Sequence, residues 1–306
     1  MRQLWVMVDR RLLIDRLLDT VAPFVARQPG SFGTQTPLPR LKIWSSTRPT
    51  QATPSMFEPM FYAVLRGTKT LTIGGNRFAL HAGDCAASSF GMPYVGELSG
   101  ATPTAPYVAI GLSLDVDLLN KVMLDMPKVE DRWVCSAAGS VLEGSLAEAF
   151  ARLVGLLVTP EDRSALGLLH ETELYYRLLR SSMGDTLRQL GQRDERRRRI
   201  KTAADWLCIH SDKPLVVSEL AASVGMSLTS FHRHFKAVTG YSPLAFQRQV
   251  RLLEARRLLF AGGVTVSSVA FAVGYISPSQ FSREYKSLFG APPVVDQRAA
   301  ENMALT

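Results

Sequence analysis

One short segment of this sequence occurs twice, and this duplication constrains the fold more than any other feature. Residues 217–243 (VSELAASVGMSLTSFHRHFKAVTGYSP) align with residues 266–293 (VSSVAFAVGYISPSQFSREYKSLFGAPP) when one inserted residue is allowed in the second copy. Aligned pairs include Phe231 with Phe281, Arg233 with Arg283, Lys236 with Lys286 and Gly240 with Gly290. A repeat of this quality indicates two copies of one small folding unit.

Each copy has the pattern of a short helix, a turn at a glycine, and a second helix that begins after a serine. In the first copy Gly225 breaks the chain, and we expect Ser227 to accept hydrogen bonds from the first amides of the next helix. In the second copy Gly274 breaks the chain, Ser277 is the expected cap, and Gln280 is expected to complete a capping box. This pattern is typical of a helix-turn-helix unit.

The second helix of each copy is predicted to have one apolar and one polar face. The apolar face repeats at helical spacing in Phe231, Phe235 and Val238, and again in Phe281, Tyr285 and Leu288. The polar face consists of Thr229, His232, Arg233 and Lys236 in the first copy, and of Ser279, Ser282, Arg283 and Lys286 in the second. Arginine offers guanine two parallel donors, hydroxyl groups and histidine reach base edges, and lysine suits phosphates. A solvated surface is the alternative, but duplication with the same polarity favours DNA contact.

A long helix is expected between the two copies. It begins at Ser242 and Pro243, runs to about Phe260 and stops at Gly262 and Gly263. Such a helix is roughly 27 Å long at 1.5 Å per residue. Because successive major grooves are about 34 Å apart, this length predicts that one monomer reads two adjacent grooves.

The surplus positive charge lies in the same half of the chain as the repeat. Residues 196–306 hold 15 Lys and Arg against 7 Asp and Glu, which accounts for the whole net charge of +8. Residues 1–195 are neutral, with 20 of each. A basic half joined to a neutral half is expected of a nucleic-acid-binding domain attached to a partner domain.

The repeated region resembles a known family. GMSLTSFHRHFKAVTGYSPLAFQRQVRLLEARRLL followed by VGYISPSQFSREYKSLFGAPP is similar to the DNA-binding region of the AraC/XylS family of bacterial transcription regulators. The resemblance covers about the last hundred residues. It implies that the base-reading positions are Thr229, His232 and Arg233 in the first unit, and Ser279, Gln280 and Arg283 in the second. It also implies activation more often than repression, with RNA polymerase as a partner of an activator.

The first half of the chain predicts a β-sandwich or small barrel. Between Arg40 and about Leu112, short apolar runs alternate with turn residues: LKIWS, MFYAVLRG, KTLTIGG, NRFALHAGDC, PYVGEL and PYVAIGLSL. Their order resembles the cupin-type barrel that serves as the sensing domain in many members of the same family. Amphipathic patterns predict helices over residues 1–29, 115–126, 145–158 and 164–189.

We therefore expect an α+β protein. Residues 1–190 would form a cupin-like, effector-sensing domain with flanking helices, of which those at about 112–190 either pack on the barrel or form a homodimer interface. Residues 191–199 (GQRDERRRR) would form a basic linker whose arginines bind phosphates or form the solvated start of a helix over 200–210. Residues 200–298 would be an all-α domain of two helix-turn-helix units joined by the long helix.

The barrel is interpreted as a ligand pocket, not an active site. Cupin catalysis uses a metal held by clustered histidines and a carboxylate, whereas this stretch contains only His81, so no catalytic residue, metal or cofactor is expected. The expected ligand-binding residues are Trp44, Tyr62 and Arg66, and Phe57, Phe61 and Tyr94 are further candidates for its mouth. Arg66 would attract an anionic ligand or, more commonly for a strand arginine, face solvent. The carboxylates of Glu171 and Glu173, beside His170, are expected at a solvated edge.

Cysteine usage and hydropathy add two expectations. Cys85, Cys135 and Cys208 are too few and too scattered for a disulfide framework or a zinc site, so free buried thiols are expected. Cys85, which follows an apparent turn, is the one candidate sensor of redox state or electrophiles. The sequence has neither a membrane-length apolar run nor a secretory signal at its start, so a cytoplasmic protein without membrane contact is expected.

Together these patterns predict a ligand-responsive regulator that binds double-stranded promoter DNA, responds to a small-molecule effector and forms a homodimer. Two alternative functions belong to other classes of protein. One is an architectural DNA-binding protein without a ligand, and the other is a cupin enzyme fused to a DNA-binding domain.

Overall fold

The computed structural model describes residues 2–27, 33–127, 134, 137–190 and 195–304. Its first half begins with helix α1 (Arg2–Arg27) and continues through nine strands among the described residues. These strands are β1 (Thr34–Gln35), β2 (Leu41–Ser46), β3 (Thr50–Met56), β4 (Met60–Arg66), β5 (Thr68–Ile73), β6 (Asn76–His81), β7 (Asp84–Ser88), β8 (Pro93–Ser99) and β9 (Tyr107–Ser113). There follow α2 (Val116–Leu124), β10 (Ala137–Val141), α3 (Gly144–Gly155), the short 3₁₀ helix η1 (Pro160–Asp162), α4 (Arg163–Arg180) and α5 (Gly184–Arg188).

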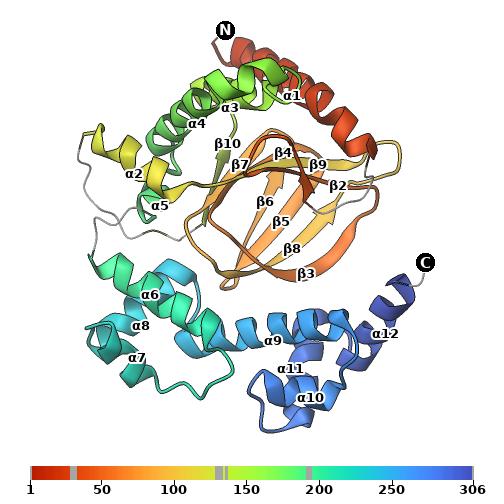
Figure 1. Cartoon of the computed structure of the whole chain (residues 1–306), viewed down its shortest axis with the longest axis vertical. Coiled ribbons are helices and arrows are strands. Elements are labelled where there is room, and N and C mark those ends of the chain that lie inside the picture. Colours follow the sequence, from red (N-terminus) through yellow and green to blue (C-terminus); the bar gives the residue numbers. More distant parts are fainter. Residues whose placement is uncertain (1, 28–32, 128–133, 135–136, 191–194, 305–306) are drawn as a thin grey trace.

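Within the described part of the chain, the strands form two antiparallel sheets. One has the order β1-β2-β9-β4-β7-β10, and the other has the order β3-β8-β5-β6. The sheets face each other in the upper half of Figure 1. The predicted α+β fold is confirmed, and the barrel is open because its strands belong to two separate hydrogen-bonded sheets.

All six apolar runs that the sequence predicted contain strands, although NRFALHAGDC divides into β6 and β7 at Gly83, which has a φ of 88°. Sequence patterning missed β1, β3 and β10. Strand β3 has the sequence TQATPSM, which is mostly polar and includes Pro54. It lies at an edge of its sheet, where a proline is tolerated, so it lacks the pattern of a buried strand.

Strand β4 lies between two hydrophobic layers. Phe61, Ala63 and Leu65 face the helices, whereas Tyr62 and Val64 face the opposite sheet. This arrangement explains why MFYAVLR is a nearly continuous apolar run, since alternate residues enter different cores. Phe61 therefore packs edge to face on Phe150 of α3, with ring centroids 5.1 Å apart, and does not reach the space between the sheets.

Helices α1, α3 and α4 cover the outer face of the six-stranded sheet (Figure 1). The predicted helix over 164–189 is two helices, because the chain turns at Ser181, whose hydroxyl donates to Leu178 O and accepts from Met183 N. Helix α1 does not stop at Pro23 but continues to Arg27. Helices α3 and α4 therefore pack on the sheet, which was one of the two alternatives for the helices within residues 112–190.

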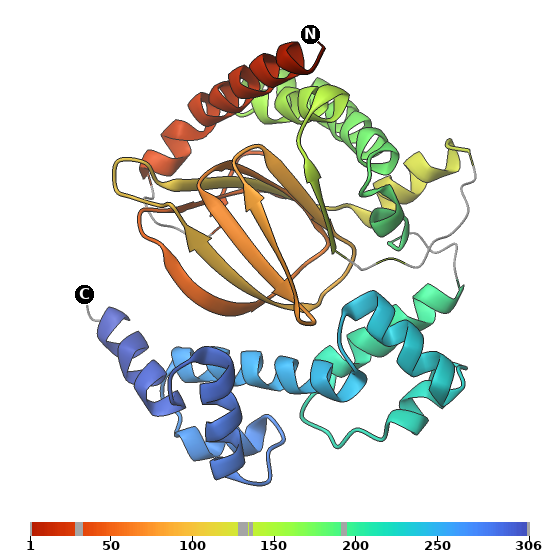
Figure 2. The same cartoon turned by 180° about the vertical axis from the view of Figure 1, so that it is seen from behind.

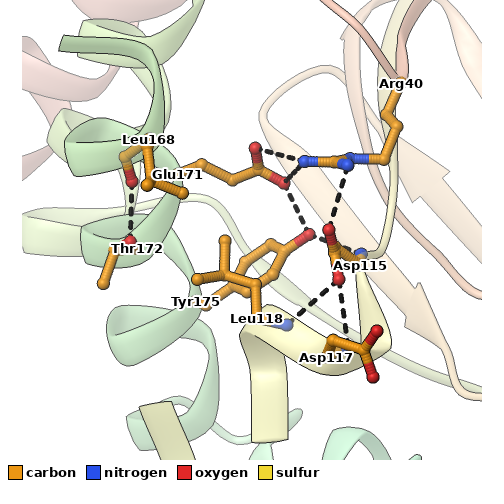
Figure 3. Close-up of polar contacts among 8 residues, drawn as sticks. All are labelled: Arg40, Asp115, Asp117, Leu118, Leu168, Glu171, Thr172 and Tyr175. Atoms are coloured by element: carbon orange, nitrogen blue, oxygen red, sulfur yellow. Dashed lines mark hydrogen bonds and ion pairs between the residues drawn. The ribbon is translucent and has the colours of Figure 1, made fainter. Parts of the chain in front are cut away.

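A partly buried ionic network fixes α2 and α4 to the start of β2 (Figure 3). The Arg40 guanidinium donates to both oxygens of Glu171 at 2.7 Å and to Asp115 Oδ2 at 3.0 Å. The Tyr175 hydroxyl donates to Glu171 Oε1 and accepts from the backbone N–H of Asp115, both at 2.7 Å. Asp115 also caps α2 by accepting from the amides of Asp117 and Leu118.

This network corrects one expectation. Glu171 was expected at a solvated edge, but it is 7% exposed because Arg40 and Tyr175 satisfy its carboxylate inside the protein. Arg40 has a φ of 68°, a left-handed conformation that is costly for a residue with a Cβ. Burial and the Glu171 carboxylate raise the pKa of Tyr175, which keeps its hydroxyl a donor near neutral pH.

The second half of the chain is helical. It consists of α6 (Glu195–Ile209), α7 (Val217–Ser223), α8 (Leu228–Thr239), α9 (Pro243–Ala261), α10 (Val266–Ala272), α11 (Pro278–Phe289) and α12 (Pro293–Ala304). Figures 1 and 2 show α9 beneath the sheets, with α7 and α8 near one end and α10 and α11 near the other. In the part of the chain that the structure describes, no helix is long and apolar enough to span a membrane.

We predict that Glu171→Gln lowers the free energy of unfolding by about 1 to 3 kcal/mol, because Arg40 then keeps its charge without its main partner. Urea denaturation measures this change. Glu173→Gln is the matched control on the same helix, since Glu173 pairs with the partly exposed Arg152 and should cost less than about 1 kcal/mol. Equal effects of the two substitutions would show that the Arg40 network contributes no special stability.

Candidate DNA-binding surface and ligand pocket

The two helix-turn-helix units repeat in structure as they do in sequence. Gly240 and Gly290 end α8 and α11, each with a φ of 80°, and their amides bond to Lys236 O and Lys286 O, both at 2.9 Å. A left-handed residue at this position favours glycine, so the duplicated glycines terminate both helices in the same way. The repeat continues to Pro243 and Pro293, which begin α9 and α12.

The predicted caps are only partly present. Ser277 Oγ accepts from the amide of Gln280 at 3.3 Å, but the Gln280 side chain donates to Glu284 instead of completing a capping box. The side chain of Ser227 makes no capping hydrogen bond at the start of α8. A capping box is found instead at α10, between Thr265 and Ser268. The predictions for Gln280 and Ser227 were therefore wrong.

The polar faces of α8 and α11 point to solvent. Phe231, Phe235, Phe281 and Tyr285 are fully buried beneath them, which confirms the predicted apolar faces. The exposed positions are Thr229, His232, Arg233 and Lys236 on α8, and Ser279, Gln280, Arg283 and Lys286 on α11, with Ser282 partly exposed. All nine predicted contact residues thus lie outside the cores of their units.

The cations on these two faces differ from several other basic residues of this half. Arg198, Arg256 and Arg257 each form an ion pair with a carboxylate 2.7 to 2.9 Å away. Within the described ranges, Arg233, Lys236, Arg283 and Lys286 form none; Arg233 contacts only the ring of His234, at 3.3 Å. The two faces therefore carry positive charge that the chain itself does not neutralise.

The four arginines form the start of a helix, which was one of the two alternatives, but this helix begins at Glu195, earlier than predicted. Residues 191–194 lie outside the described residues, whereas the four arginines form the first turns of α6. Arg197 is 5% exposed, Arg198 and Arg199 pair with Glu195, and Arg199 donates to Gly225 O at 2.6 Å. Arg199 thus joins α6 to the turn between α7 and α8, and the burial of Arg197 leaves less of the arginine run for phosphates than the sequence indicated.

The connecting helix α9 belongs to both units. Phe246 and Val250 pack in the core of the first unit, and Leu252, Ala255 and Leu259 pack in the core of the second. With 19 residues it is about 28 Å long, which confirms the expected rod.

Arg251, in the middle of α9, joins the two units through backbone carbonyls. Its guanidinium donates to Ser211 O, to Asp212 O at 3.3 Å and to Lys213 O at 2.9 Å, all before α7 in the first unit. It also donates to Gly274 O, at the turn of the second unit, at 3.1 Å. A Cβ on Gly274 would lie 2.0 Å from Asp212 O, so the two turns touch through a glycine.

A cavity of about 200 Å³ lies between the two sheets of the first half. Trp44 and Tyr62, two of the expected ligand residues, line it together with Phe57, Lys69, Phe78 and Tyr94. The Trp44 indole has room because Gly111 lies on the neighbouring strand, where a Cβ would be 2.5 Å from the ring. Arg66 is not among the lining residues, and Phe61 faces the helices.

Lys69 is a cavity residue that sequence reasoning missed. Its Nζ lies 4.5 Å from the Tyr62 ring centroid and 5.5 Å from that of Tyr94. Burial alone would lower the pKa of Lys69, but Tyr62 and Tyr94 outweigh burial and raise it. The signal was present in KTLTI, because alternation places Lys69 on the same face as the buried Leu71 and Ile73.

The cavity wall is also the contact with the first helix-turn-helix unit. Phe57 and Tyr94, stacked with centroids 4.0 Å apart, pack with Met56 and Phe78 against one buried cluster. This cluster, which we call the interdomain core, consists of Ile73, Phe90 and Met92 from the sheets and Ile200, Phe231, Phe235 and Phe246, among others, from the helices.

The tip of the β5–β6 hairpin closes this contact. A Cβ on Gly74 would lie 2.1 Å from Gly240 O, which shows how closely the hairpin meets the end of α8. Helix α11 and helix α9 also lie against β3. The sheets and the candidate DNA-binding half are therefore in direct contact.

The remaining candidate residues are His81 and the cysteines. His81 is exposed, and its Nδ1 lies 3.2 Å from Thr68 Oγ1. Cys85 is fully buried among the helices and sheet, so its thiol is inaccessible to a reagent in the folded protein. Burial, followed by the charge of Asp205, raises the pKa of Cys208 to about 11. Cys135 lies outside the described residues.

Two family models match this chain. Residues 37–186 match the AraC-type transcriptional regulator N-terminus, and residues 220–299 match a helix-turn-helix domain. The matched ranges contain the cavity and most of both helix-turn-helix units.

Part of the chain is also similar in sequence to individual transcriptional activators. The chain is 32% identical over 152 residues to the virulence regulon transcriptional activator VirF of Yersinia enterocolitica, covering 48% of this chain and 54% of VirF. It is 32% identical over 95 residues to the transcriptional activator RhaS of Klebsiella pneumoniae, covering 31% of this chain and 34% of RhaS. The chain thus spans about half the length of VirF and less of RhaS.

A fold match that covers most of both chains is found among solved structures. The structure of ToxT from Vibrio cholerae with a bound unsaturated fatty acid superposes with a TM-score of 0.54, covering 84% of this chain and 94% of that chain. The identity is 9%, so this similarity concerns the fold alone.

We predict that Arg251→Gln lowers the free energy of unfolding of the helical half by about 1 to 3 kcal/mol, because four backbone carbonyls, of which two accept partly buried hydrogen bonds, lose a charged donor. Thermal or urea unfolding measures this loss. Arg248→Gln, on the exposed side of the same helix, should change stability by less than about 0.5 kcal/mol. A neutral Arg251→Gln would mean that the units are held together by apolar packing alone.

We predict that Gly74→Ala separates the hairpin tip from α8. Hydrogen exchange should become faster both in residues 73–76 and in residues 236–241, because the added methyl group displaces the backbone of Gly240. Gly75→Ala is the control, since Gly75 also has a positive φ but a Cβ added there would meet no atom within 4 Å. It should affect residues 73–76 only; unchanged exchange at 236–241 in Gly74→Ala would contradict the close contact.

Proposed function

We propose, from the premise that this chain belongs to the AraC-type transcriptional regulators, that it binds promoter DNA in response to a small molecule. The observation that carries the proposal is the pair of exposed cationic faces on α8 and α11. Among the described residues, Arg233, Lys236, Arg283 and Lys286 are exposed and form no ion pair with a carboxylate, whereas Arg198, Arg256 and Arg257 do. Phosphates and guanine edges would provide the missing partners.

The roles of individual side chains follow from their chemistry. Arg233 and Arg283 read guanines through two parallel donors, while Lys236 and Lys286 bind phosphates. Thr229 and His232 on α8, and Ser279, Gln280 and Ser282 on α11, complete the two reading faces. Gln280 must release Glu284 to reach a base, because its side-chain amide donates to that carboxylate at 3.1 Å.

The geometry of α9 supports the reading of two adjacent grooves. Its length of about 28 Å places the two units at a separation comparable with the roughly 34 Å between successive major grooves. Arg251 and the contact at Gly274 keep the units from rotating independently. One monomer therefore presents both faces to one stretch of duplex.

The effector acts through the interdomain core. Trp44 and Tyr62 contact the effector in the cavity, whose wall residues Phe57 and Tyr94 also pack against the core shared with the first unit. An occupant that moves these rings changes the contact on which the orientation of α8 depends. Such coupling requires that the effector favour one arrangement of the two halves over the other.

The partners follow from this role. VirF and RhaS are activators, and we infer that this protein also activates transcription and contacts RNA polymerase. We also infer a homodimer, formed by helices within 112–190, that works in the cytoplasm with chromosomal DNA. Residues 1–190 act as the sensing domain, 191–199 as the junction and 200–298 as the DNA-binding domain, and none of these steps involves catalysis.

We predict that Arg233→Ala and Arg283→Ala each weaken binding to a selected promoter fragment by about 1 to 3 kcal/mol and relax base preference at one position. Lys236→Ala should weaken binding to all sequences alike and reduce the salt dependence by about one phosphate contact. Gel-shift titrations on selected and scrambled duplexes at several salt concentrations measure both effects.

The same titrations separate this proposal from an architectural DNA-binding protein. Such a protein would bind both duplexes with affinities set almost wholly by salt. If Arg233→Ala and Arg283→Ala bound both duplexes as tightly as the parent protein, α8 and α11 would not be the reading helices. Arg257→Ala is a suitable control, because Arg257 is paired with Glu254 on α9 and should leave DNA affinity within about twofold of the parent.

A further inference from the structure

Lys69 occupies a position that the fold assigns to an apolar side chain. It precedes Leu71 and Ile73 on the inward face of β5, and both of these residues are at most 2% exposed. Lysine is rarely placed in such a position unless its charge has a partner. Lys69 itself is partly exposed and lines the cavity, so the cavity contains an ammonium group.

Among the described residues that line the cavity, no carboxylate balances this charge. The lining carboxylate is that of Glu58, which lies 3.9 Å from Nζ of Lys42, another lining residue. The neighbours of the Lys69 ammonium are the rings and hydroxyls of Tyr62 and Tyr94. Burial raises the pKa of Tyr62 well above its ordinary value, so its hydroxyl is neutral near pH 7 and supplies no negative charge.

We propose that the cavity binds a small organic carboxylate, with its negative charge on Lys69 and its body against the aromatic wall. This inference rests on the proposed function, since it names the chemical class of the effector. A carboxylate has one charge, which equals the charge left unbalanced in the cavity, and it accepts hydrogen bonds from an ammonium group and from tyrosine hydroxyls at the same time. A dianionic phosphate would bring more charge than Lys69 balances.

The volume limits the body of the ligand. An enclosed cavity of about 150 Å³ accommodates benzene, and this cavity, which is partly open to solvent, measures about 200 Å³. The additional space is sufficient for a carboxylate on a single ring. Trp44, Phe57 and Tyr94 provide ring faces and edges for an aromatic body, which favours an arylcarboxylate such as benzoate over a long aliphatic acid.

Ligand binding to the DNA-free full-length protein tests this inference by calorimetry. Benzoate should bind at least about tenfold more tightly than its neutral isostere benzamide, because the ionic hydrogen bond to Lys69 is lost in the amide. Hexadecanoate should bind more weakly than benzoate. Equal affinity for benzoate and benzamide, or no binding of benzoate, would overturn the role of Lys69, and tighter binding of hexadecanoate would overturn the size limit.

A pair of lysine variants assigns the charge. Lys69→Met should lose at least about tenfold in benzoate affinity and keep its affinity for benzamide, which also serves as evidence that the pocket is folded. Lys42→Met is the control, because Glu58 already offsets its charge, and it should change benzoate affinity by less than about threefold. If both substitutions reduced benzoate affinity equally, the anion would lie outside the Lys69 site.

The inference and the proposed function fail in different ways. Specific DNA binding without benzoate binding would refute the carboxylate site and leave the regulator proposal intact. Benzoate binding without any sequence-specific DNA binding would refute the regulator proposal and leave the carboxylate site intact. Where both bindings occur, gel shifts with saturating benzoate should show a changed affinity for the selected fragment in the parent protein and not in Lys69→Met.

Discussion

The single helix α9 determines how the candidate DNA-binding half is built, because both helix-turn-helix cores include residues from it. Phe246 and Val250 belong to the first core, and Leu252, Ala255 and Leu259 belong to the second. Arg251 then ties the loop before α7 to the turn at Gly274 through four backbone carbonyls. The two polar faces are consequently held at one separation and one mutual orientation, which a flexible linker would not provide.

The same half is joined to the sheets by apolar contacts. Ile73, Phe90 and Met92 enter the core of the first unit, and Phe57 and Tyr94 pack against that core while lining the cavity. A ligand in the cavity would therefore touch residues that pack against the same core as Phe231 and Phe235, which lie beneath the polar face of α8. Packed side chains connect the cavity with this helix, and we propose that they transmit displacement, because protein interiors contain little free volume.

Sequence reasoning succeeded where a residue's role depends on local periodicity. The duplicated glycines, the two-faced helices and the length of α9 all follow from spacing along the chain, and so do the six apolar strands. It failed where a role depends on a partner far away in sequence. Glu171 is buried because Tyr175 and Arg40, which lies 131 positions earlier, satisfy its carboxylate, and the Gln280 side chain bonds to Glu284 and not to the backbone of Ser277.

Other features were missed because the sequence pattern was compatible with two interpretations. Lys69 has inward-facing spacing, yet a strand lysine is commonly solvated, and only the neighbouring Tyr62 and Tyr94 distinguish the two cases. The choice among Trp44, Phe57, Phe61 and Tyr62 as pocket residues likewise required the register of two facing sheets, which no single strand specifies.

The central claim is that one monomer binds two adjacent major grooves on the same side of a DNA duplex. Hydroxyl-radical footprinting of the full-length protein, on a fragment that it selects from the genome encoding it, tests this claim most directly. The account predicts two protected tracts on one face of the helix, with centres about one turn, or roughly 10 base pairs, apart. A single tract, or protection that is equally strong on a scrambled fragment, would contradict it.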